Sequence, residues 1–428
     1  LVATLTNSTT VYGSLIFTAI SQLNGNPLVV RGNVSFNDTA WSGSSKLLFT
    51  SNTAQTVNGV GVCGVTFEVS STSSVSLNNH LTLTGPSDLI VSFGHLSCGG
   101  TFNVTLPKNF IVNYSGGAGL FSSNNSTFIF NGANPTITVN SQFNNLTLNN
   151  SAMIANFSNS AIINGALTLT ALATINGSPI EARGNMVFTD AAWNGTGRLL
   201  VNGTVDQNVS GVGDVSDLEI NKASGNLIFN SSVVVSRKWT HTTGSIVWNS
   251  NAVAFNGATG TIVNGNFYNL VLNGTSLILT ITNNTIVNNL LTATALATLN
   301  GSPVEVRGNV VLTDTSWGGT SKLLFNGTGL QTNTGAGVCG VTMDVNKTSG
   351  SLDLGANLTL LGATADLNLI AGTINCGTFT LTVPRNFTQT GGVFNGGTNT
   401  NTISGALNVS VGNFNATSGN LTVPNGAI

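Results

Sequence analysis

Charge is the scarcest property of this 428-residue sequence, since Asp, Glu, Lys and Arg make up only 6% of it and the net charge is -2 at pH 7. Soluble globular proteins contain about 25% charged residues. Disorder is not expected, because 41% of the residues are hydrophobic and disordered chains combine low hydrophobicity with high net charge. No apolar run approaches the roughly 18 residues of a membrane helix, so we expect no membrane span. Without clustered Lys and Arg to contact phosphates, we expect no nucleic-acid partner.

Helix signals are also missing, because no stretch carries an apolar stripe with a period near 3.6 residues. Apolar residues instead alternate with Thr, Ser or Asn, as in "FNNLTLNN" at 143–150 and "FYNLVLNG" at 267–274. A period of two residues is typical of a β-strand. Asn-Gly pairs, which tolerate the positive φ of tight turns, separate many of these runs. The sequence therefore predicts an all-β protein.

Three long repeats organise the chain. The stretch "NGSPVEVRGNVVLTDTSWGGTSKLLF" at 300–325 has earlier counterparts that begin at residues 24 and 176. A second landmark, "LPKNF" at 106–110, returns at 236–239 and 383–387, and it comes about 23 residues too early in the second repeat. A solenoid can lose one whole coil, because each coil contacts only its neighbours. We therefore expect a β-solenoid of roughly 19 coils with segments 1–23, 24–175, 176–299 and 300–428, and tandem β-sandwich domains are the alternative.

Several phrases carry a resemblance, among them "FNNLTLNNSAM", "FYNLVLNGTSLILTITNN" and "GTFTLTVPRNFTQTGGVFNGG". In style the sequence resembles the secreted β-strand-repeat, autotransporter-like adhesin and surface proteins of bacteria and archaea. That resemblance implies a right-handed β-helix and a role as adhesin, stalk, sheath or filament subunit. The sequence lacks the Ca²⁺-binding nonapeptide repeats of one branch of these proteins.

The four cysteines occur as two equivalent pairs. Cys63 and Cys98 lie in the first repeat, Cys339 and Cys376 lie in the third, and the second repeat has none. Two residues that are present or absent together are most simply two halves of a disulfide, so we predict bonds from Cys63 to Cys98 and from Cys339 to Cys376. Such bonds indicate an oxidising exterior. The alternative is a zinc site from the H-x-x-C spacing of His95 and Cys98, but the third repeat has no equivalent histidine.

The charged residues follow the repeat rather than gathering at one site. Four columns are strongest: Arg31, Arg183 and Arg307; Asp38, Asp190 and Asp314; Trp41, Trp193 and Trp317; Lys46, Arg198 and Lys322. Two further columns join them: Glu68, Glu219 and Asp344; Lys108, Arg237 and Arg385. Strand parity points each Asp of the second column inward, where it needs neighbouring N-H groups or a basic side chain as a partner.

Two interpretations of these columns are open. In the first, ion pairs and one Trp per repeat fix which coil stacks on which in a monotonous stack. In the second, exposed Trp, Asp and Arg form a carbohydrate-binding site that occurs three times. The sequence favours the register interpretation.

Catalytic and metal-binding patterns find little support. The three histidines have no equivalents in other repeats and lie in no recognised catalytic motif. An acidic cluster at Asp206, Asp214, Asp217 and Glu219 occurs in the second repeat alone, where a solvated turn is favoured over a weak Ca²⁺ site. We therefore expect no enzyme activity and no cofactor other than N-linked glycans.

Sequons of the form N-x-S/T are more frequent than the Ser and Thr content alone would give. This excess favours an extracellular or cell-surface glycoprotein. Compositional bias is the alternative. We name nine candidate glycosylation sites: Asn7, Asn33, Asn103, Asn145, Asn194, Asn273, Asn326, Asn386 and Asn420.

These observations together predict an extracellular structural protein, a glycosylated repeat subunit of a surface filament, sheath or layer. Both ends of the sequence are strand-like and carry no charged cap, so we expect coils to stack end to end with copies of the same chain. The sequence has no initiator Met and no signal peptide, as expected for a processed protein or a piece of a longer one. An adhesin or glycan-binding stalk that contacts glycans or other cells is the alternative.

Overall fold

The fold is built from β-strands that pair in parallel with the next turn of the chain. The computed structural model describes the chain except for residues 114–118, 140–141, 173, 191–194 and 425–428. No helix occurs among the described residues, and stacked parallel coils form a β-solenoid of about 20 turns. The predicted all-β solenoid is therefore confirmed. The alternative prediction of tandem β-sandwich domains is wrong, because sandwiches are built from antiparallel sheets.

Two compact units divide the chain. Unit 1 contains Leu1–Ser216 and Asn221–Ile228, and unit 2 contains Asp217–Ile220 and Phe229–Ile428. The division falls inside the predicted second repeat, so the repeats and the compact units are different subdivisions of the chain. The repeat boundaries themselves stay a prediction.

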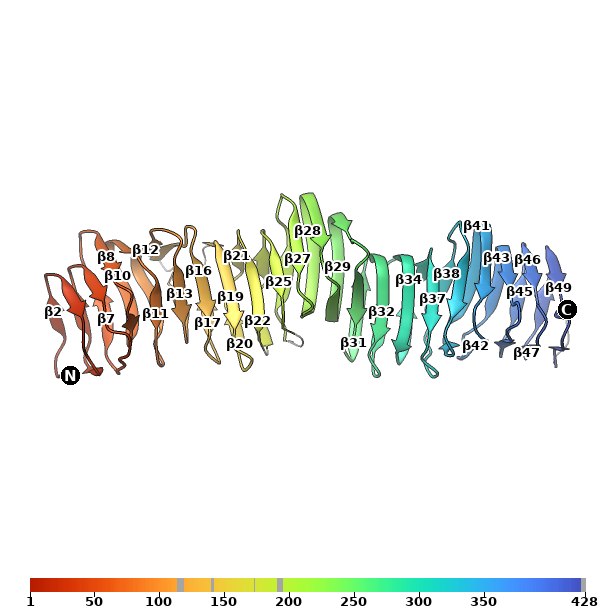
Figure 1. Ribbon diagram of the computed structural model, residues 1–428, viewed down its shortest axis with the longest axis horizontal. Coiled ribbons are helices and arrows are strands. Elements are labelled where there is room, and N and C mark those ends of the chain that lie inside the picture. The colour runs from red at the N-terminus through yellow and green to blue at the C-terminus, as the bar shows by residue number, and fades with distance from the viewer. Residues whose placement is uncertain (114–118, 140–141, 173, 191–194, 425–428) are drawn as a thin grey trace. The chain divides into compact units, whose positions relative to one another are not determined.

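The strands of unit 1 stack in chain order along each face, as the first view shows (Figure 1). They are β1 (Val2–Leu5), β2 (Thr9–Val11), β3 (Leu15–Phe17), β4 (Gln22–Gly25), β5 (Leu28–Val30), β6 (Val34–Phe36), β7 (Lys46–Phe49), β8 (Gln55–Asn58), β9 (Val62–Cys63), β10 (Thr66–Leu77), β11 (Leu81–Leu83), β12 (Leu89–Cys98), β13 (Asn103–Leu106), β14 (Phe110–Val112), β15 (Gly119–Ser122), β16 (Thr127–Phe130), β17 (Thr136–Thr138), β18 (Gln142–Phe143), β19 (Asn145–Asn149), β20 (Ile154–Phe157), β21 (Ala161–Ile163), β22 (Leu167–Ala171), β23 (Thr174–Gly177), β24 (Ile180–Ala182), β25 (Met186–Phe188), β26 (Arg198–Val201) and β27 (Gln207–Ser210). The next strand, β28 (Asp214–Phe229), contributes residues to both units.

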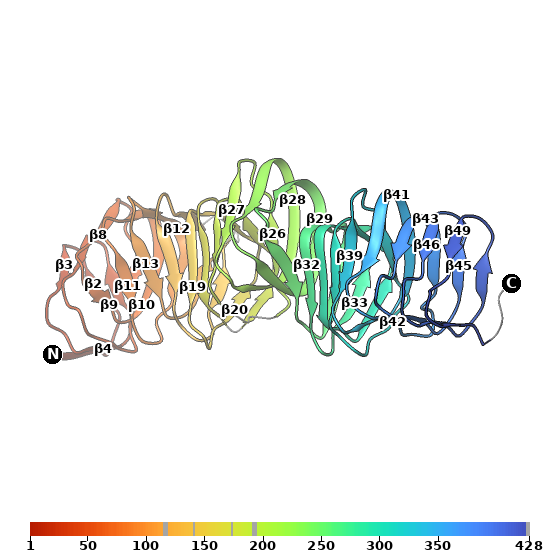
Figure 2. The same cartoon turned by 45° about the vertical axis from the view of Figure 1, so that its right-hand side comes forward.

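The strands of unit 2 stack in the same way, and the turned view shows more than one of their faces (Figure 2). They are β29 (Val233–Val247), β30 (Ala252–Phe255), β31 (Thr259–Val263), β32 (Asn266–Asn273), β33 (Ile278–Ile281), β34 (Thr285–Ala295), β35 (Thr298–Gly301), β36 (Val304–Val306), β37 (Asn309–Leu312), β38 (Lys322–Phe325), β39 (Gln331–Thr334), β40 (Val338–Cys339), β41 (Thr342–Leu354), β42 (Leu358–Leu360), β43 (Leu367–Asn375), β44 (Leu381–Val383), β45 (Phe387–Gln389), β46 (Val393–Asn395), β47 (Asn401–Ile403), β48 (Leu407–Val409), β49 (Asn413–Asn415) and β50 (Leu421–Thr422).

Alternation within each strand builds the core. In β7 the sequence KLLF buries Leu47 and Phe49 and leaves Lys46 and Leu48 facing outward. Parallel pairing then places Leu47 opposite Phe67 of β10, one coil further on. Neighbouring strands lie about 4.8 Å apart, so inward side chains of successive coils are in contact within each unit. Burial of these side chains supplies most of the favourable free energy of folding.

Glycine fixes the corner that opens each repeat. Gly25, Gly177 and Gly301 all have φ near +88°, a conformation that other residues rarely adopt. A Cβ atom at Gly25 would lie 2.3 Å from the carbonyl oxygen of Leu5 in the preceding coil. The Asn-Gly pair of the repeat is therefore required both by the turn and by the close approach of the previous coil.

Candidate functional site

The tryptophan of the repeat closes a coil from the inside. Trp41 and Trp317 are only 4% and 5% exposed, and their indole Nε1 atoms donate to the carbonyl oxygens of Val62 (2.7 Å) and Val338 (2.8 Å) in the next coil. Neither ring has a face available for stacking on a sugar, which the carbohydrate-binding interpretation requires. Trp193 lies outside the described residues.

The aspartate of the repeat caps backbone N-H groups, which are one of the partners that the parity argument named, but Asp38 and Asp314 are half-buried rather than turned fully inward. Asp38 accepts from Ile20 N of the previous coil (2.6 Å) and from Ala40 N (3.2 Å). Asp314 accepts from Leu296 N (2.5 Å) and Ser316 N (3.0 Å) in the same arrangement. These bonds, above all the one from Ile20, hold the pKa of Asp38 below its ordinary value because they stabilise the carboxylate.

Basic and acidic columns meet across neighbouring coils. Lys46 contacts Glu68 (2.5 Å) in unit 1, and Lys322 contacts Asp344 (2.6 Å) in unit 2. In each case the lysine begins one strand and the acid lies on its parallel neighbour, two residues beyond the residue opposite the lysine. The equivalent residue of the second repeat, Arg198, begins β26 and is exposed. The register interpretation requires such contacts and stays a prediction.

The arginine column has two kinds of partner. Arg183 and Arg307 pair with the glutamates two residues before them on the same strand face, Glu181 (3.3 Å) and Glu305 (2.6 Å). In the first repeat Val29 occupies that position. There the guanidinium of Arg31 lies over the ring of Tyr12, 5.2 Å from its centroid.

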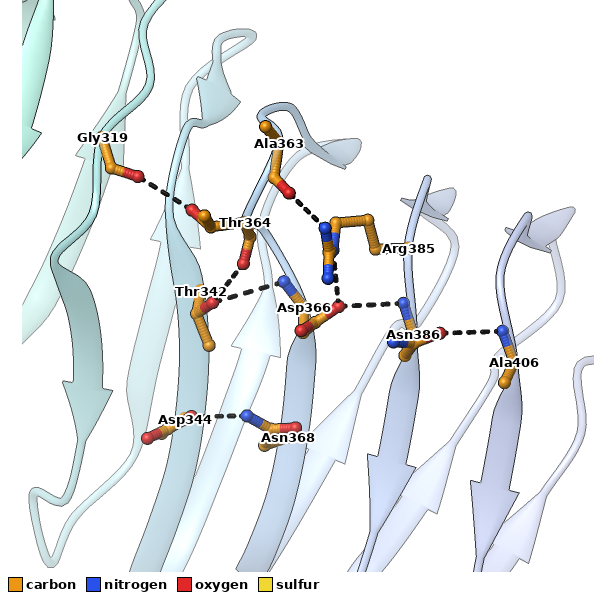
Figure 3. Close-up of polar contacts among 10 residues, drawn as sticks. All are labelled: Gly319, Thr342, Asp344, Ala363, Thr364, Asp366, Asn368, Arg385, Asn386 and Ala406. Atoms are coloured by element: carbon orange, nitrogen blue, oxygen red, sulfur yellow. Dashed lines mark hydrogen bonds and ion pairs between the residues drawn. The ribbon is translucent and has the colours of Figure 1, made fainter.

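A further basic column anchors the second landmark. Lys108 contacts Asp88 at 3.6 Å, Arg237 contacts Asp217 at 3.3 Å and Arg385 contacts Asp366 at 3.0 Å. Figure 3 shows the last of these pairs as part of a polar network across several coils of unit 2.

In that network the hydrogen bonds pass from coil to coil. Asp366 also accepts from the backbone of Asn386 (3.1 Å), and the Asn386 side chain accepts in turn from Ala406 N (3.0 Å; Figure 3). A neighbouring bond links Asn368 to Asp344 (2.8 Å), the acid that Lys322 contacts. The charged and amide side chains here satisfy backbone and side-chain partners of adjacent coils.

Buried polar residues form a second repeated feature, which the sequence analysis missed. Gln55, Gln207 and Gln331 are each no more than 1% exposed. Each Nε2 donates to two carbonyl oxygens of the previous coil, for example those of Val306 (3.0 Å) and Gly308 (2.6 Å) for Gln331. The glutamines therefore replace the strand ladder where the coil turns.

Two buried lysines lie against these glutamines. Lys222 donates to Gln207 Oε1 (2.6 Å) and to Gly203 O (2.6 Å). Lys347 donates to Gln331 Oε1 (2.6 Å) and to Gly327 O. Both lysines are 1% exposed, and burial lowers the pKa of each. The motif N-K-x-S-G, present at 221–225 and 346–350, was the sequence signal for this pair.

The predicted disulfides are not present, because all four cysteines are free and buried. Cys63 belongs to the coil of β8 and β9, Cys98 to the coil of β12 and β13, and the coil of β10 and β11 lies between them. Two strand spacings amount to about 9.6 Å, whereas bonded cysteines have Cα atoms less than about 7 Å apart. The same arrangement separates Cys339 from Cys376. Burial raises the pKa of every one of these thiols to about 12.

The acidic cluster of the second repeat contains one unusual group. Asp214 is 3% exposed, and its Oδ1 atom has no hydrogen-bond partner. Burial raises its pKa to about 7, and the nearby Asp190 carboxylate contributes in the same direction. Asp206 is exposed and accepts from Asn226 N at 2.7 Å. Among the described residues no group of three or more His, Cys, Asp or Glu is arranged to hold a metal ion.

Most predicted glycosylation sites lie at the surface. Asn7, Asn33, Asn103, Asn273 and Asn420 are exposed, and Asn145, Asn326 and Asn386 are half-buried. Asn194 lies outside the described residues. Asn33 and Asn145 use Oδ1 to accept from backbone N-H groups of the next coil, at 2.8 and 2.7 Å. An N-linked sugar is attached through Nδ2, so these bonds are compatible with glycosylation.

Comparison with protein-family models, with curated proteins and with solved structures gives no significant match. The described part of the chain contains no helix that is both long and apolar enough to cross a membrane.

Proposed function

We propose that this chain is a structural protein of the cell exterior, a glycosylated subunit of a surface filament, sheath or layer whose main partners are copies of itself. One observation carries the proposal: the charged residues that recur with the repeat contact neighbouring coils, their own strand or a coil corner. Lys46 with Glu68 and Lys322 with Asp344 are the clearest examples. Charged residues that contact other parts of the same protein in this way support a stiff framework.

The composition supports association between copies. A net charge of -2 over 428 residues provides little long-range repulsion to keep copies apart. Half-buried and exposed Asn, Ser and Thr side chains cover much of the surface, and sequons among them offer attachment points for glycans that keep such a surface hydrated. Stacking of coils supplies a mode of assembly that needs no cofactor.

Electron microscopy of the native material tests this proposal. We expect ordered filaments, sheets or sheaths that contain this chain, and reassembly of the purified protein as its concentration rises in analytical ultracentrifugation. A purified chain that stays monomeric at every concentration, together with native material made only of dispersed particles, would exclude the structural assembly. Retention of that monomer on an immobilised glycan would instead support the adhesin alternative.

A further inference from the structure

Two open pockets occupy equivalent positions in the second and third repeats. The pocket in unit 1 has a volume of about 490 Å³ and is lined by Asn164, Arg183, Asn202, Gly203, Thr204 and Val205. The pocket in unit 2 has a volume of about 440 Å³ and is lined by Glu305, Arg307, Asn326, Gly327, Thr328 and Gly329. Each therefore contains the arginine of the repeat and a complete Asn-Gly-Thr sequon.

The sequon asparagine of each pocket is held at the corner that follows a strand. The Oδ1 atoms of Asn202 and Asn326 are buried and have no hydrogen-bond partner. The Nδ2 atom of Asn202 donates to Glu181 Oε2 at 3.0 Å. An amide nitrogen carries two hydrogens, and an N-linked sugar replaces only one of them. The contact with Glu181 is therefore retained after attachment.

A buried lysine holds the backbone carbonyl of the sequon glycine in each pocket. The carbonyl oxygen of Gly203 accepts from the buried ammonium of Lys222 (2.6 Å), and that of Gly327 accepts from Lys347. Each lysine is also bound by a buried glutamine. The floor of the pocket is thus ordered before any ligand arrives, which reduces the entropic cost of seating one.

The first repeat provides an internal comparison. Where the other repeats have Glu, Asn and Lys in this region, it has Val29, Thr50 and Ser71. Its arginine, Arg31, lies over Tyr12 instead of beside a glutamate. The acid, the sequon and the buried lysine are therefore present together in the second and third repeats and absent together from the first, as expected for parts of one site.

We propose that Asn202 and Asn326 carry N-linked glycans whose first sugar, a hexose or N-acetylhexosamine, is seated in these pockets against Arg183 and Arg307. The proposal rests on the proposed extracellular, glycosylated role. A lipid-linked glycosyl diphosphate is the donor. The Nδ2 to C1 bond forms, the C1 to phosphate oxygen bond breaks with its electron pair leaving on the phosphate, and one Nδ2 proton is released.

The chemistry of the pocket fits a sugar. Ligand pockets of about 300 to 1,000 Å³ with a few placed polar groups are typical of small-molecule sites. Arg307 uses Nε for its bond to Glu305, and a guanidinium has further N-H donors in a fixed plane for sugar oxygens. In the unit 2 pocket Glu305 provides an acceptor for a sugar hydroxyl, and in the unit 1 pocket the side-chain oxygen of Asn164 can take that part. A neutral saccharide leaves the Arg-Glu ion pair intact, whereas a charged ligand would compete with one member of it.

Site-resolved mass spectrometry of glycopeptides from the natively produced protein tests the attachment. We expect Asn202 and Asn326 to be occupied. Bare Asn202 and Asn326 in a protein that is glycosylated at other sequons would overturn the inference and leave the structural role in place. A protein without any glycan would overturn the inference as well, and electron microscopy would then decide the assembly separately.

The seating of the sugar is tested by the rate at which an amidase releases the glycan from the folded protein. We expect Arg307→Met to speed release from Asn326 about tenfold, the equivalent of about 1.4 kcal/mol of lost contact. Release from the exposed Asn420 provides an internal standard. Lys322→Met, which removes a cation of similar exposure from the same repeat outside the pocket, is the matched control. Equal rates for Arg307→Met and the parent protein would refute the seated sugar.

Discussion

The buried carboxyl of Asp214 leads us to predict how the free energy of unfolding depends on pH. In the first and third repeats the equivalent positions are Val62 and Val338, and all three residues donate their backbone N-H to the repeat aspartate's carbonyl oxygen at 2.8 Å. Only the second repeat therefore places a second carboxyl, that of Asp214, beside the carboxyl of the repeat aspartate, which in this repeat is Asp190. We expect Asp214→Val to adopt the geometry of the other two repeats without strain.

The magnitude follows from the pKa. Burial raises the pKa of Asp214 from 3.8 to about 7 in the folded protein, so the folded state binds its proton more tightly than the unfolded state. The free energy of unfolding then falls as pH rises between about 4 and 7, with a slope of up to 1.36 kcal/mol per pH unit. Over this window the parent protein loses at most about 4 kcal/mol from this group. Asp214→Val removes the loss, so the variant is more stable at neutral pH.

Urea unfolding followed by tryptophan fluorescence measures the effect from pH 4 to pH 8. At a slope of about 3 kcal/mol per molar urea, the variant's midpoint at neutral pH lies roughly 1 M above the parent's, and the difference shrinks toward pH 4. Val212→Ala, a change at an exposed side chain two residues before Asp214, should leave the pH dependence unaltered. Parallel pH profiles for parent and Asp214→Val would refute the reasoning.

Three further predictions concern buried groups. Iodoacetamide at pH 8 should leave all four thiols of the folded protein unmodified and label all four after unfolding, as read by intact mass, because burial disfavours the thiolate; rapid labelling of the folded protein would contradict this. Lys347→Met should lower the free energy of unfolding by about 1 to 3 kcal/mol in urea titrations, because the buried Gly327 O loses its ammonium donor and Gln331 Oε1 keeps only the backbone N-H of Gly327, whereas Lys238→Met at an exposed position should change it little. Trp317→Phe should cost about 1 to 3 kcal/mol in the same titrations, since the carbonyl oxygen of Val338 loses the indole donor, and an unchanged midpoint would argue against that bond.

The fold was predictable because its determinants are local. Alternation in stretches such as 143–150 fixes which side chains are buried in each strand. The Asn-Gly pairs mark corners where φ is positive, as at Gly177 and Gly301. The loss of about one coil from the second repeat distinguished a solenoid from a sandwich, because only a stack tolerates it.

The disulfide prediction was wrong because it did not take into account how many coils separate the two cysteines of each pair. Residues in contact across adjacent coils are separated by about one coil, as for Lys46 and Glu68, which are 22 residues apart. Cys63 and Cys98 are separated by more than one coil, so their strands cannot be adjacent in the stack. The same reasoning from coil length would have predicted the ion pairs and excluded the disulfides.

The buried glutamines and lysines could not be predicted from polarity alone. A polar residue near a corner is usually solvated, and burial of a lysine is rare unless it is paired. What makes burial possible is a set of carbonyl oxygens that the turn leaves without ladder partners, as at Gly203 and Gly327. Those oxygens become visible only when the path of the backbone is known.

The repeated polar residues fall into two classes that predict different consequences. All three repeats have an arginine at the position of Arg307, an aspartate at that of Asp314, and a lysine or arginine at that of Lys322. Asp314 and Lys322 hold one coil against the next. Glu305 and Lys347 have counterparts only where an Asn-Gly-Thr sequon lies beside them. In the first repeat the hydroxyl of Ser71 donates to the carbonyl oxygen of Ser51, the counterpart of Gly327, so that repeat closes the same corner without a lysine, and Val29 replaces the glutamate. Because the corner closes without Glu and Lys in the first repeat, we attribute their presence in the second and third repeats to the proposed glycans at Asn202 and Asn326 rather than to the stability of the stack.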